Sequence, residues 1–569
     1  MTRARLGALL ALLALAVVVP AVASGYALTQ DPAQGPAEQV AFVVIVPGVS
    51  FEELLGIPDV AALARAGGAA LLVDAEDAVT FHEHALSGEK RFVLNPLEGE
   101  LRAIVDRYPY LAGSPEVDDL LLIVLGTDPK DETPISHLTG IVIARGQPDE
   151  LFPESGDQGS LTSDSTRRDG VVIGGDVAPT IDGFLPGGSR VWGELPPGEP
   201  IRIIDGPPPF ELNERYLAQR RMYIPVGVAA VLYLAGAGLA AIAFLARRRS
   251  VPEQWQRVAG WMAFSVPMLA VGLLAAGHLP ELSYASAVPM IAIVTVFGTM
   301  AFSPLERREL AVVPAGIGAA VIAFFVAEGL LGWSGMLTPL VGGAQLDGGR
   351  FFGLPNVAIG LLVGATMWVA QRASTAAGFS LTCAVALFAG LPLVGANLGA
   401  AVTLFAAAGL WLAVRERERL GRWMGTAAFV AVTVVGTGVI LVSHAISPFP
   451  THVTRFEQDV DGIAGIWDKF LERLQVGFDL IAGNPLALIP VVGIVAVVVI
   501  VLRPPPAIRE TFARWPAWRD ANLVIALAGV IAYLANDSGP AAVGFAFGLA
   551  LGGMLGMPLL AGSSKMGAE

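Results

Sequence analysis

Long apolar blocks separated by short polar segments make up the second half of the chain. From Met222 onward each block is long enough, or nearly long enough, to cross the roughly 30 Å hydrocarbon core of a bilayer as a helix. The pattern predicts an all-α membrane domain over 222–560 with about eleven transmembrane helices. They are expected near residues 222–246, 257–279, 286–303, 310–332, 356–371, 376–393, 397–414, 424–443, 484–502, 522–535 and 539–560.

Arginine-rich segments between these blocks predict their orientation. Lys and Arg concentrate in cytoplasmic loops, and all five basic segments fall on that side if the first helix enters from outside. This arrangement predicts a multi-pass protein of the cell membrane, with the preceding domain outside the cytoplasm and the C-terminus inside. The basic segments are Arg247–Arg249, Arg307–Arg308, Gln371–Arg372, Arg415–Arg422 and Arg503–Arg519.

Residues 1–24 have the pattern of a secretory signal. Arg3 and Arg5 precede an apolar run of 14 residues, Leu6–Val19, which is short for a spanning helix, and small residues follow it. Cleavage after Ala23 is one prediction, and an uncleaved N-terminal anchor is the alternative. Either one sends the residues that follow out of the cytoplasm.

Between about 38 and 210 the pattern changes to short β-branched runs that alternate with helical stretches. This alternation predicts an α/β soluble domain with a layered sheet. Fully apolar strands such as Val40–Val46 and Leu120–Leu125 are typical of buried parallel strands, and sites in such sheets form at the carboxyl ends of strands. The other expected strands are Ala69–Val73 and Leu138–Ala144, and the expected helices are Phe51–Ala66 and Leu101–Tyr108.

Composition and charge separate the two parts further. The chain is 54% hydrophobic and only 15% charged, which excludes an ordinary soluble protein. Residues 31–210 hold 30 acidic and 11 basic residues, a net charge of −19, whereas the whole chain carries −14 and the remainder therefore +5. The single Cys383 excludes an intrachain disulfide and a CxxC site. The part of the chain predicted to lie outside the cytoplasm has no basic patch, so nucleic acid is not an expected partner. The sequence has no Gly-rich phosphate loop on the cytoplasmic side, so a nucleotide is not expected either.

Three segments of the α/β region match a known family in order. The first is the end of a predicted strand, Gly126-Thr127-Asp128, and the second contains the next predicted strand, His137–Ile143. The third follows later in the chain and reads Asp176-Val177-Ala178-Pro179-Thr180. Over residues 40–190 this set resembles the alkaline phosphatase superfamily, which includes sulfatases and cofactor-independent phosphoglycerate mutases. The resemblance implies an alkaline-phosphatase-like layered sheet and, in active members, metal-dependent phosphoryl chemistry. It makes Asp128, His137 and Asp176 candidate metal ligands, and Asp128 and Asp176 candidate catalytic residues.

Two positions depart from the family's pattern. Family members have Asp-Gly after the first strand and Asp-His-Gly after a later one, whereas this chain has Pro47-Gly48 and Asp128-Pro129-Lys130. Proline supplies no metal ligand, and zinc sites need three or four ligands. The soluble domain is therefore expected to be a pseudoenzyme. An active metal-dependent phosphohydrolase or phosphotransferase would need a rearranged Zn or Mn site.

Other residues of the soluble domain offer alternative chemistry. His82 and His84 would share one face of a strand and could bind a metal with a nearby carboxylate, or they are exposed polar residues of an acidic loop. Arg167 and Arg168 follow a run of hydroxyl residues and are candidates for phosphate or sulfate binding, or they belong to a solvated loop. Ser50 follows the first strand and is a candidate nucleophile without a visible base.

Polar residues recur at the predicted outer ends of the spans. Such groups are costly in a membrane unless they are buried in protein or line a wet cavity, so they are functional candidates, although helix caps are the alternative. The segment from Arg350 to Asn356 is similar to a patch of O-antigen ligases and polymerases, which implies that Arg350 contacts a lipid pyrophosphate. Glu328 lies near the outer end of a predicted span and is an expected partner of Arg350. The candidates at this face are Arg350, Asn356, Asn397, His444, Asn536 and Asp537.

An amphipathic helix is expected over 453–480, because apolar residues step by three and four there. It would lie on the outer membrane surface or under the soluble domain. Three functions stay open: a degenerate outward domain that binds or regulates, an active phosphotransferase or hydrolase on envelope lipids or glycopolymers, and a membrane module that acts as a transporter or lipid-linked glycan enzyme. The bilayer is the expected partner in each, with an envelope lipid or lipid-linked glycan as the expected ligand.

Overall fold

The computed structural model describes most of the chain from Gln39 onward, and these residues belong to one unit, Gln39–Glu569. The predicted signal or anchor over 1–24 lies outside the described residues, as do the expected helix Leu101–Tyr108 and most of the amphipathic stretch 453–480. The described residues are 39–46, 49–73, 92–93, 119–126, 138–147, 150–151, 153, 157–184, 198–248, 250–306, 309–342, 352–447, 471, 475, 478, 482, 488–536 and 540–563.

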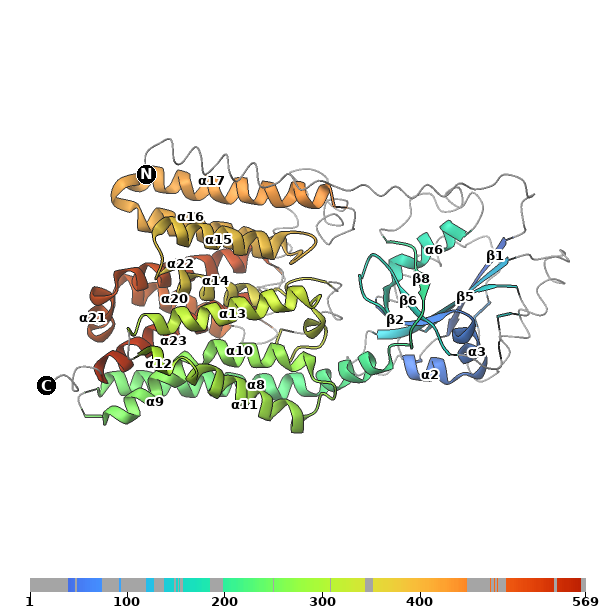
Figure 1. The fold of residues 1–569 in the computed structure, drawn as a ribbon, viewed down its shortest axis with the longest axis horizontal. Helices are drawn as coiled ribbons and strands as arrows, with labels where there is room; N and C mark the ends of the chain where they lie inside the picture. Colours follow the sequence, from blue (N-terminus) through green and yellow to red (C-terminus); the bar gives the residue numbers. More distant parts are fainter. Residues whose placement is uncertain are drawn as a thin grey trace. The chain divides into compact units, whose positions relative to one another are not determined.

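An eight-stranded mixed sheet forms the N-terminal part (Figure 1). Its order is β3-β1-β4-β5-β2-β6-β8, and β7 also pairs with β2. The two apolar strands that were expected to be parallel do pair in parallel, with Gln39 opposite Asp119 and Val46 opposite Gly126. The strands are β1 (Gln39–Val46), β2 (Gly68–Val73), β3 (Phe92–Val93), β4 (Asp119–Gly126), β5 (Leu138–Gly146), β6 (Ser160–Thr162), β7 (Val171–Ile173) and β8 (Arg202–Ile204).

Helices cover both faces of this sheet because alternate strand residues point to opposite sides. Leu122 and Val124 of β4 pack in the cluster that holds α2 (Phe51–Gly56) and α3 (Pro58–Ala66). Leu121, Ile123 and Leu125 pack in the opposite cluster, with α6 (Val177–Phe184). The single helix expected over 51–66 is instead two helices, because Ile57 is extended immediately before Pro58 and breaks the helical path.

The rest of the described chain is a helical module. Its helices are α8 (Phe210–Ala246), α9 (Glu253–Phe264), α10 (Val266–Ala275), α11 (Tyr284–Met300), α12 (Ser303–Glu306), α13 (Val312–Leu330), α14 (Ala358–Ala370), α15 (Thr375–Gly390), α16 (Leu398–Arg415), α17 (Arg417–Ala445), α20 (Leu488–Leu502), α21 (Pro506–Arg514), α22 (Pro516–Ala535) and α23 (Pro540–Ser563). Short 3-10 turns lie at η1 (Gly174–Asp176), η2 (Ala276–His278) and η3 (Ser334–Leu337).

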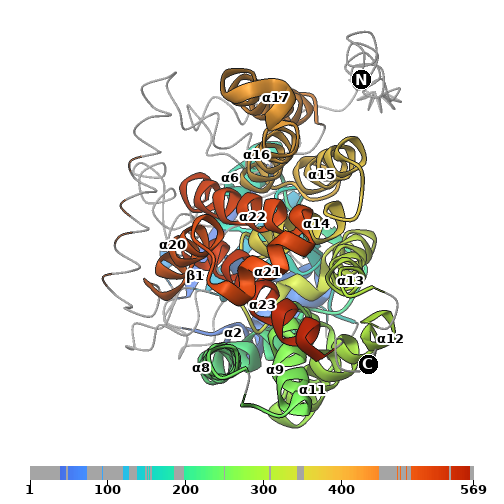
Figure 2. The ribbon, with the colours of Figure 1, turned by 90° about the vertical axis from the view of Figure 1, so that its left-hand side faces the viewer.

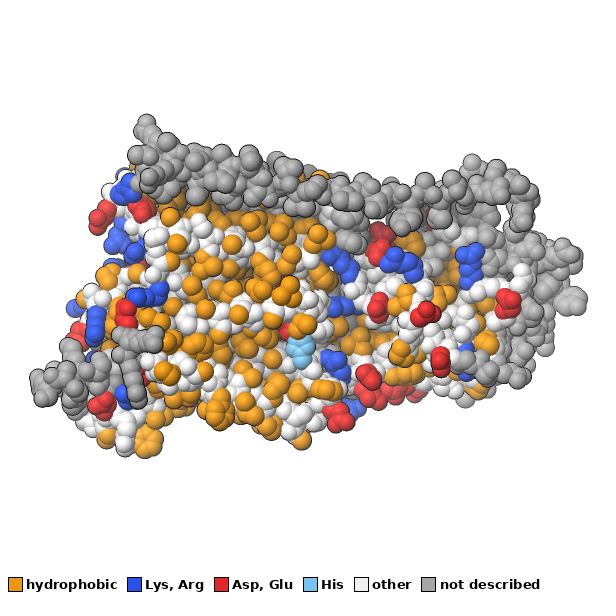
Figure 3. All heavy atoms as spheres, in the orientation of Figure 1, with side chains coloured by type: hydrophobic (Ala, Val, Ile, Leu, Met, Phe, Trp, Pro, Cys, Tyr) orange, Lys and Arg blue, Asp and Glu red, His pale blue; other side chains and the backbone are white. Residues whose placement is uncertain are grey.

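Within the described residues, seven helices are long and apolar enough to cross a membrane. The number rises to nine if each of two bent pairs, α9 with α10–η2 and α20 with α21, is one span. Hydrophobic side chains cover the flanks of these helices on the face shown in Figure 3. The chain is therefore a multi-pass membrane protein by the length and composition of its helices. The predicted segments 356–371 and 376–393 coincide with the shorter apolar helices α14 and α15.

Helix α14 lies at the centre of the module (Figure 2). Of its thirteen residues only Val369 is not buried, and it packs against α13, α15, α22 and α23. Thirteen helical residues extend about 20 Å, less than the hydrocarbon thickness. Helix α14 is therefore short and enclosed by the other helices of the module.

Helix α8 joins the two parts of the unit. It has 37 residues and begins at Phe210, whereas the sequence pattern predicted a helix from Met222. The additional turns are polar, and they carry Tyr216, whose buried ring belongs to the same hydrophobic cluster as α2 and α3. The helix that leads into the membrane therefore completes the core of the α/β domain.

Candidate functional site

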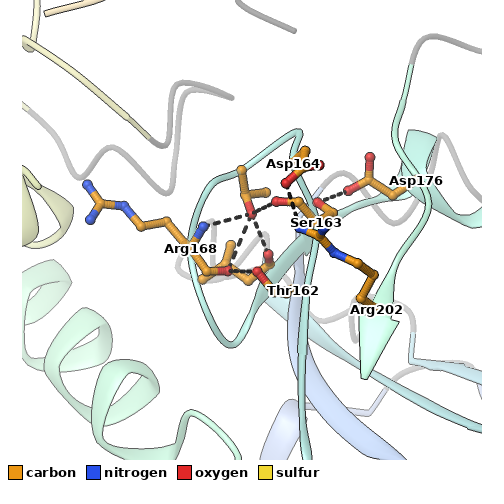
Figure 4. A network of polar contacts seen from close by, with 8 residues as sticks. Thr162, Ser163, Asp164, Arg168, Asp176 and Arg202 are labelled. Carbon is orange, nitrogen blue, oxygen red and sulfur yellow. Dashed lines mark hydrogen bonds and ion pairs between the residues drawn. The ribbon is translucent and has the colours of Figure 1, made fainter. Parts of the chain in front are cut away.

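A buried carboxylate organises one end of the α/β domain. Asp176 is fully buried at the end of η1, immediately before α6. Its Oδ2 accepts a hydrogen bond from Ser163 Oγ at 2.6 Å (Figure 4). The same oxygen accepts from Ile173 N at 3.1 Å, and Oδ1 accepts from Glu199 N at 3.0 Å. This side chain thereby ties together three segments that are distant in sequence.

Burial raises the pKa of Asp176 above its ordinary value, while the hydrogen bonds from Ser163, Ser165 and the two backbone amides act in the opposite direction. Both carboxylate oxygens accept hydrogen bonds from the protein itself. These contacts indicate a structural role for Asp176, which stabilises the loop before α6.

The loop from Leu161 to Gly170 presents two arginines to the helical module. The Arg167 guanidinium donates to the carbonyl of Pro392 at 2.8 Å, and Arg168 donates to the carbonyl of Trp333 at 3.1 Å. Both guanidinium groups lie over the ring of Phe352, at 4.7 and 6.0 Å from its centroid. In Figure 4 the side chain of Arg168 extends away from the hydrogen-bonded loop that carries it.

Three segments of the helical module form the other side of this contact, and we call residues 333–340, 352–357 and 391–397 the junction loops. Asn397 holds two of them together, because its Nδ2 donates to Leu354 O at 2.8 Å and to Asn356 Oδ1 at 2.9 Å. Its Oδ1 caps α16 by accepting from Ala400 N at 2.9 Å. Trp333 Nε1 adds a bond of 2.6 Å to Val394 O.

Backbone strain concentrates at the same place. Among the described residues, three that are not glycine have positive φ: Arg167 at 54°, Trp333 at 63° and Ala396 at 48°. Each such residue costs about 1–2 kcal/mol relative to an ordinary conformation. All three lie in the loops that meet at this contact, and strained backbone of this kind clusters at functional sites.

A buried acid lies behind the arginines. Glu328, near the end of α13, is 2% exposed, and its carboxylate contacts the imidazole of His278 of η2. Burial lowers the pKa of Arg168 to about 10, and the negative charge of Glu328 opposes this shift. Arg168 therefore stays charged at neutral pH. Arg350, the predicted partner of Glu328, lies outside the described residues, so the contact that the structure shows for Glu328 is the one with His278.

The structure brings several of the candidate residues together. Asn356 and Asn397 bond directly, and Asn536 lies against Gly399 in the first turn of α16, since a Cβ at Gly399 would meet its Oδ1. His444 is fully buried, with Nε2 at 2.9 Å from Gly390 O, close in sequence to the junction loop 391–397. Together these contacts gather four of the polar residues expected at helix ends around the junction loops.

Ser50 lies elsewhere and caps α2. Its Oγ accepts from Glu53 N at 3.3 Å, and the Glu53 carboxylate accepts from Ser50 N at 2.8 Å. This reciprocal pair is a capping box, and it lowers the pKa of Glu53. His82, His84, Asp128, His137, Arg350 and Asp537 lie outside the described residues.

Three residues of this site were missed in the sequence analysis. Trp333, Phe352 and Pro392 supply the surface that the arginines contact. Phe352 lies within the segment that drew attention through Arg350, and Trp333 follows the Gly332 that ends a predicted span. Neither signal identifies an arginine partner, since these contacts join residues more than 160 positions apart.

Among the described residues, no group of three or more His, Cys, Asp or Glu side chains is arranged to hold a metal ion. The fold and the contact define a multi-pass membrane protein whose sheet domain is bound to the loops of its helical module. Comparison with known protein families, curated proteins and solved structures gives no match to this chain.

Proposed function

We propose that this protein is a multi-pass protein of the cell envelope whose α/β domain binds to the helical module and regulates it, without itself performing catalysis. In this proposal the domain lies outside the cytoplasm and descends from an alkaline-phosphatase-like ancestor. Its regulatory surface is the contact between Arg167, Arg168 and the junction loops.

The docking of the two arginines carries this proposal. Arg167 and Arg168 donate to main-chain carbonyls of the helical module and lie over the ring of Phe352, so both side chains join the α/β domain to the junction loops. Asp176, the most distinctive residue of the resemblance, is bonded to Ser163 and two backbone amides. The side chains that suggested chemistry are thus engaged in holding the domain together and in place.

The sequence supports the rest of the proposal. Each of the eleven predicted spans coincides with a helix or a bent pair of helices, and this agreement favours an eleven-span arrangement over one of seven or nine. In that arrangement the arginine-rich segments all fall on one side, and this supports an α/β domain on the opposite, extracytoplasmic side. The departures at Pro47 and Pro129 favour a degenerate domain over an active phosphotransferase.

The test is the metal content and hydrolytic activity of the purified full-length protein. A shortened α/β domain is unsuitable, because Tyr216 of α8 completes its core. We expect no stoichiometric Zn or Mn after dialysis without chelator, and no turnover of a phosphomonoester or phosphodiester. Near-stoichiometric metal with turnover that Asp128→Ala abolishes would instead establish the alternative, an extracytoplasmic phosphohydrolase or phosphotransferase.

A further inference from the structure

A cavity of about 660 Å³ lies between α8, α9, α11 and α12, far in sequence from the junction loops. This volume falls within the range of about 300–1,000 Å³ that is usual for small-molecule sites. Most of the lining residues lie on α9 and α11. Along the same two helices, close to these lining residues, large hydrophobic side chains are exposed, such as Trp255, Ile293 and Phe297. The cavity therefore opens on the flank that faces lipid.

A bend between α9 and α10 creates the space. The two helices meet at Ser265 with an angle of 43°, and Pro267 in the first turn of α10 has no N–H to continue the helical bonding. Helix α11 packs along α10 but touches α9 much less. The diverging helix α9 thus leaves a gap beside α11 that Tyr233 of α8 only partly fills.

Four hydroxyl groups of the lining are already bonded within the protein, those of Tyr233, Ser265, Thr295 and Thr299. Tyr233 donates to Ser265 Oγ at 2.7 Å, and Ser265 donates to Met262 O. Thr295 and Thr299 each donate to the carbonyl four residues earlier, at 2.6 and 2.5 Å. A bound molecule therefore meets few free donors in the interior, which suits an acyl chain better than a sugar.

Two polar side chains of α9, one of them an arginine, also line the cavity. Arg257 and Gln254 of α9 are exposed there, and Arg257 donates to Glu306 at 3.0 Å. One guanidinium has five donors, so it can hold a phosphate beside Glu306. Trp255 lies at the same level of α9, and exposed tryptophan is typical of the headgroup region.

We propose that this cavity binds one anionic glycerophospholipid of the surrounding bilayer. The phosphate lies at Arg257, and one acyl chain enters between α9 and α11 toward Ser265 and Thr295. Ser265 lies eight positions after Arg257, a helical rise of about 12 Å, and the acyl chain is enclosed over this length. Basic pockets at the ends of membrane helices bind anionic headgroups in this way.

Native mass spectrometry of the full-length protein released from nanodiscs of equimolar phosphatidylcholine and phosphatidylglycerol tests the proposal. We expect one retained lipid, with phosphatidylglycerol preferred. Val296→Trp fills the rim of the cavity and should abolish retention, whereas Ile293→Trp should not. The two positions match closely, since Val296 is 54% and Ile293 55% exposed on the same helix, and only Val296 lines the cavity.

A second pair of variants tests the headgroup contact. Arg257→Gln should reduce the preference for phosphatidylglycerol roughly fivefold to tenfold. Arg419→Gln should leave it unchanged, because Arg419 also pairs with a glutamate but does not line the cavity. Absence of a retained lipid, equal retention by Val296→Trp and Ile293→Trp, or an unchanged preference in Arg257→Gln would each overturn the proposal.

Discussion

Replacement of Asp176 by alanine should destabilise the loop before α6 by about 3 kcal/mol. The change removes the acceptor of two buried donors, Ser163 Oγ and Ile173 N, and of the partly buried Glu199 N. Each orphaned donor costs about 1–3 kcal/mol. Removal of the buried carboxylate offsets part of this sum, because burying a charge is itself unfavourable. A loss of local stability in Asp176→Ala therefore indicates that Asp176 has a structural role rather than a catalytic one.

Hydrogen exchange of the full-length protein, followed by mass spectrometry, measures this effect. A loss of about 3 kcal/mol speeds exchange roughly a hundredfold in amides that open locally, and the amides of Ile173 and Glu199 should show it. The matched control is Asp182→Ala on α6, a partly exposed position where the effect should stay within about 0.5 kcal/mol. Unchanged exchange in Asp176→Ala would refute the structural role.

The pH dependence of hydrogen-exchange protection in this loop tests the role of Asp176 independently. Burial raises the pKa of Asp176, so the folded state holds its proton more tightly than the unfolded state does. By linkage, this stabilisation is complete below the ordinary pKa of an aspartate and is lost as the pH rises through the folded-state pKa. Asp176→Asn cannot titrate and should remove this part of the pH dependence. If the loop of the wild-type protein became more stable over the same rise in pH, the raised pKa of Asp176 would be contradicted.

Three further variants test the junction. Asn397→Ala should lower thermal stability by about 2–4 kcal/mol, since it removes the cap of α16 and the bond to Asn356; a melting temperature within error of wild type would refute this. Ala396→Gly should stabilise the protein by about 1 kcal/mol in the same assay, because glycine adopts the observed φ of 48° without strain; destabilisation would show that the strain is absent. Arg168→Lys should raise hydrogen exchange around Trp333, because an ammonium cannot replace the planar guanidinium over Phe352; unchanged exchange would show that charge alone suffices.

Local patterns predicted the elements of this protein well. The apolar blocks coincide with helices, and the β-branched runs Val40–Val46 and Leu120–Leu125 lie within a pair of parallel strands. The beginning of α8 was missed because its first turns are polar, so no apolar run marked them. The break at Ile57 follows from Pro58, a signal that was present in the sequence and was not used.

The site was predictable only in part. Residue type and position in the sequence pointed to Arg167, Arg168, Asn356 and Asn397, but not to their partners. The partners lie at long sequence separations and depend on how the helices pack. Positive φ at a residue other than glycine, as at Trp333, also has no sequence signature, because it is imposed by the surrounding contacts.

Docking of the α/β domain through its two arginines is the central claim, and a distance measurement tests it most directly. Spin labels at Gly183→Cys on α6 and Leu393→Cys in a junction loop, with Cys383→Ser, report the separation of the two parts by double electron–electron resonance. Arg202→Gln is the control, since its exposed ion pair with Asp164 contributes little. We predict one narrow distance distribution for the protein with native arginines and for the control, and a broad one after Arg167→Gln with Arg168→Gln. Identical distributions in all three proteins would contradict the account.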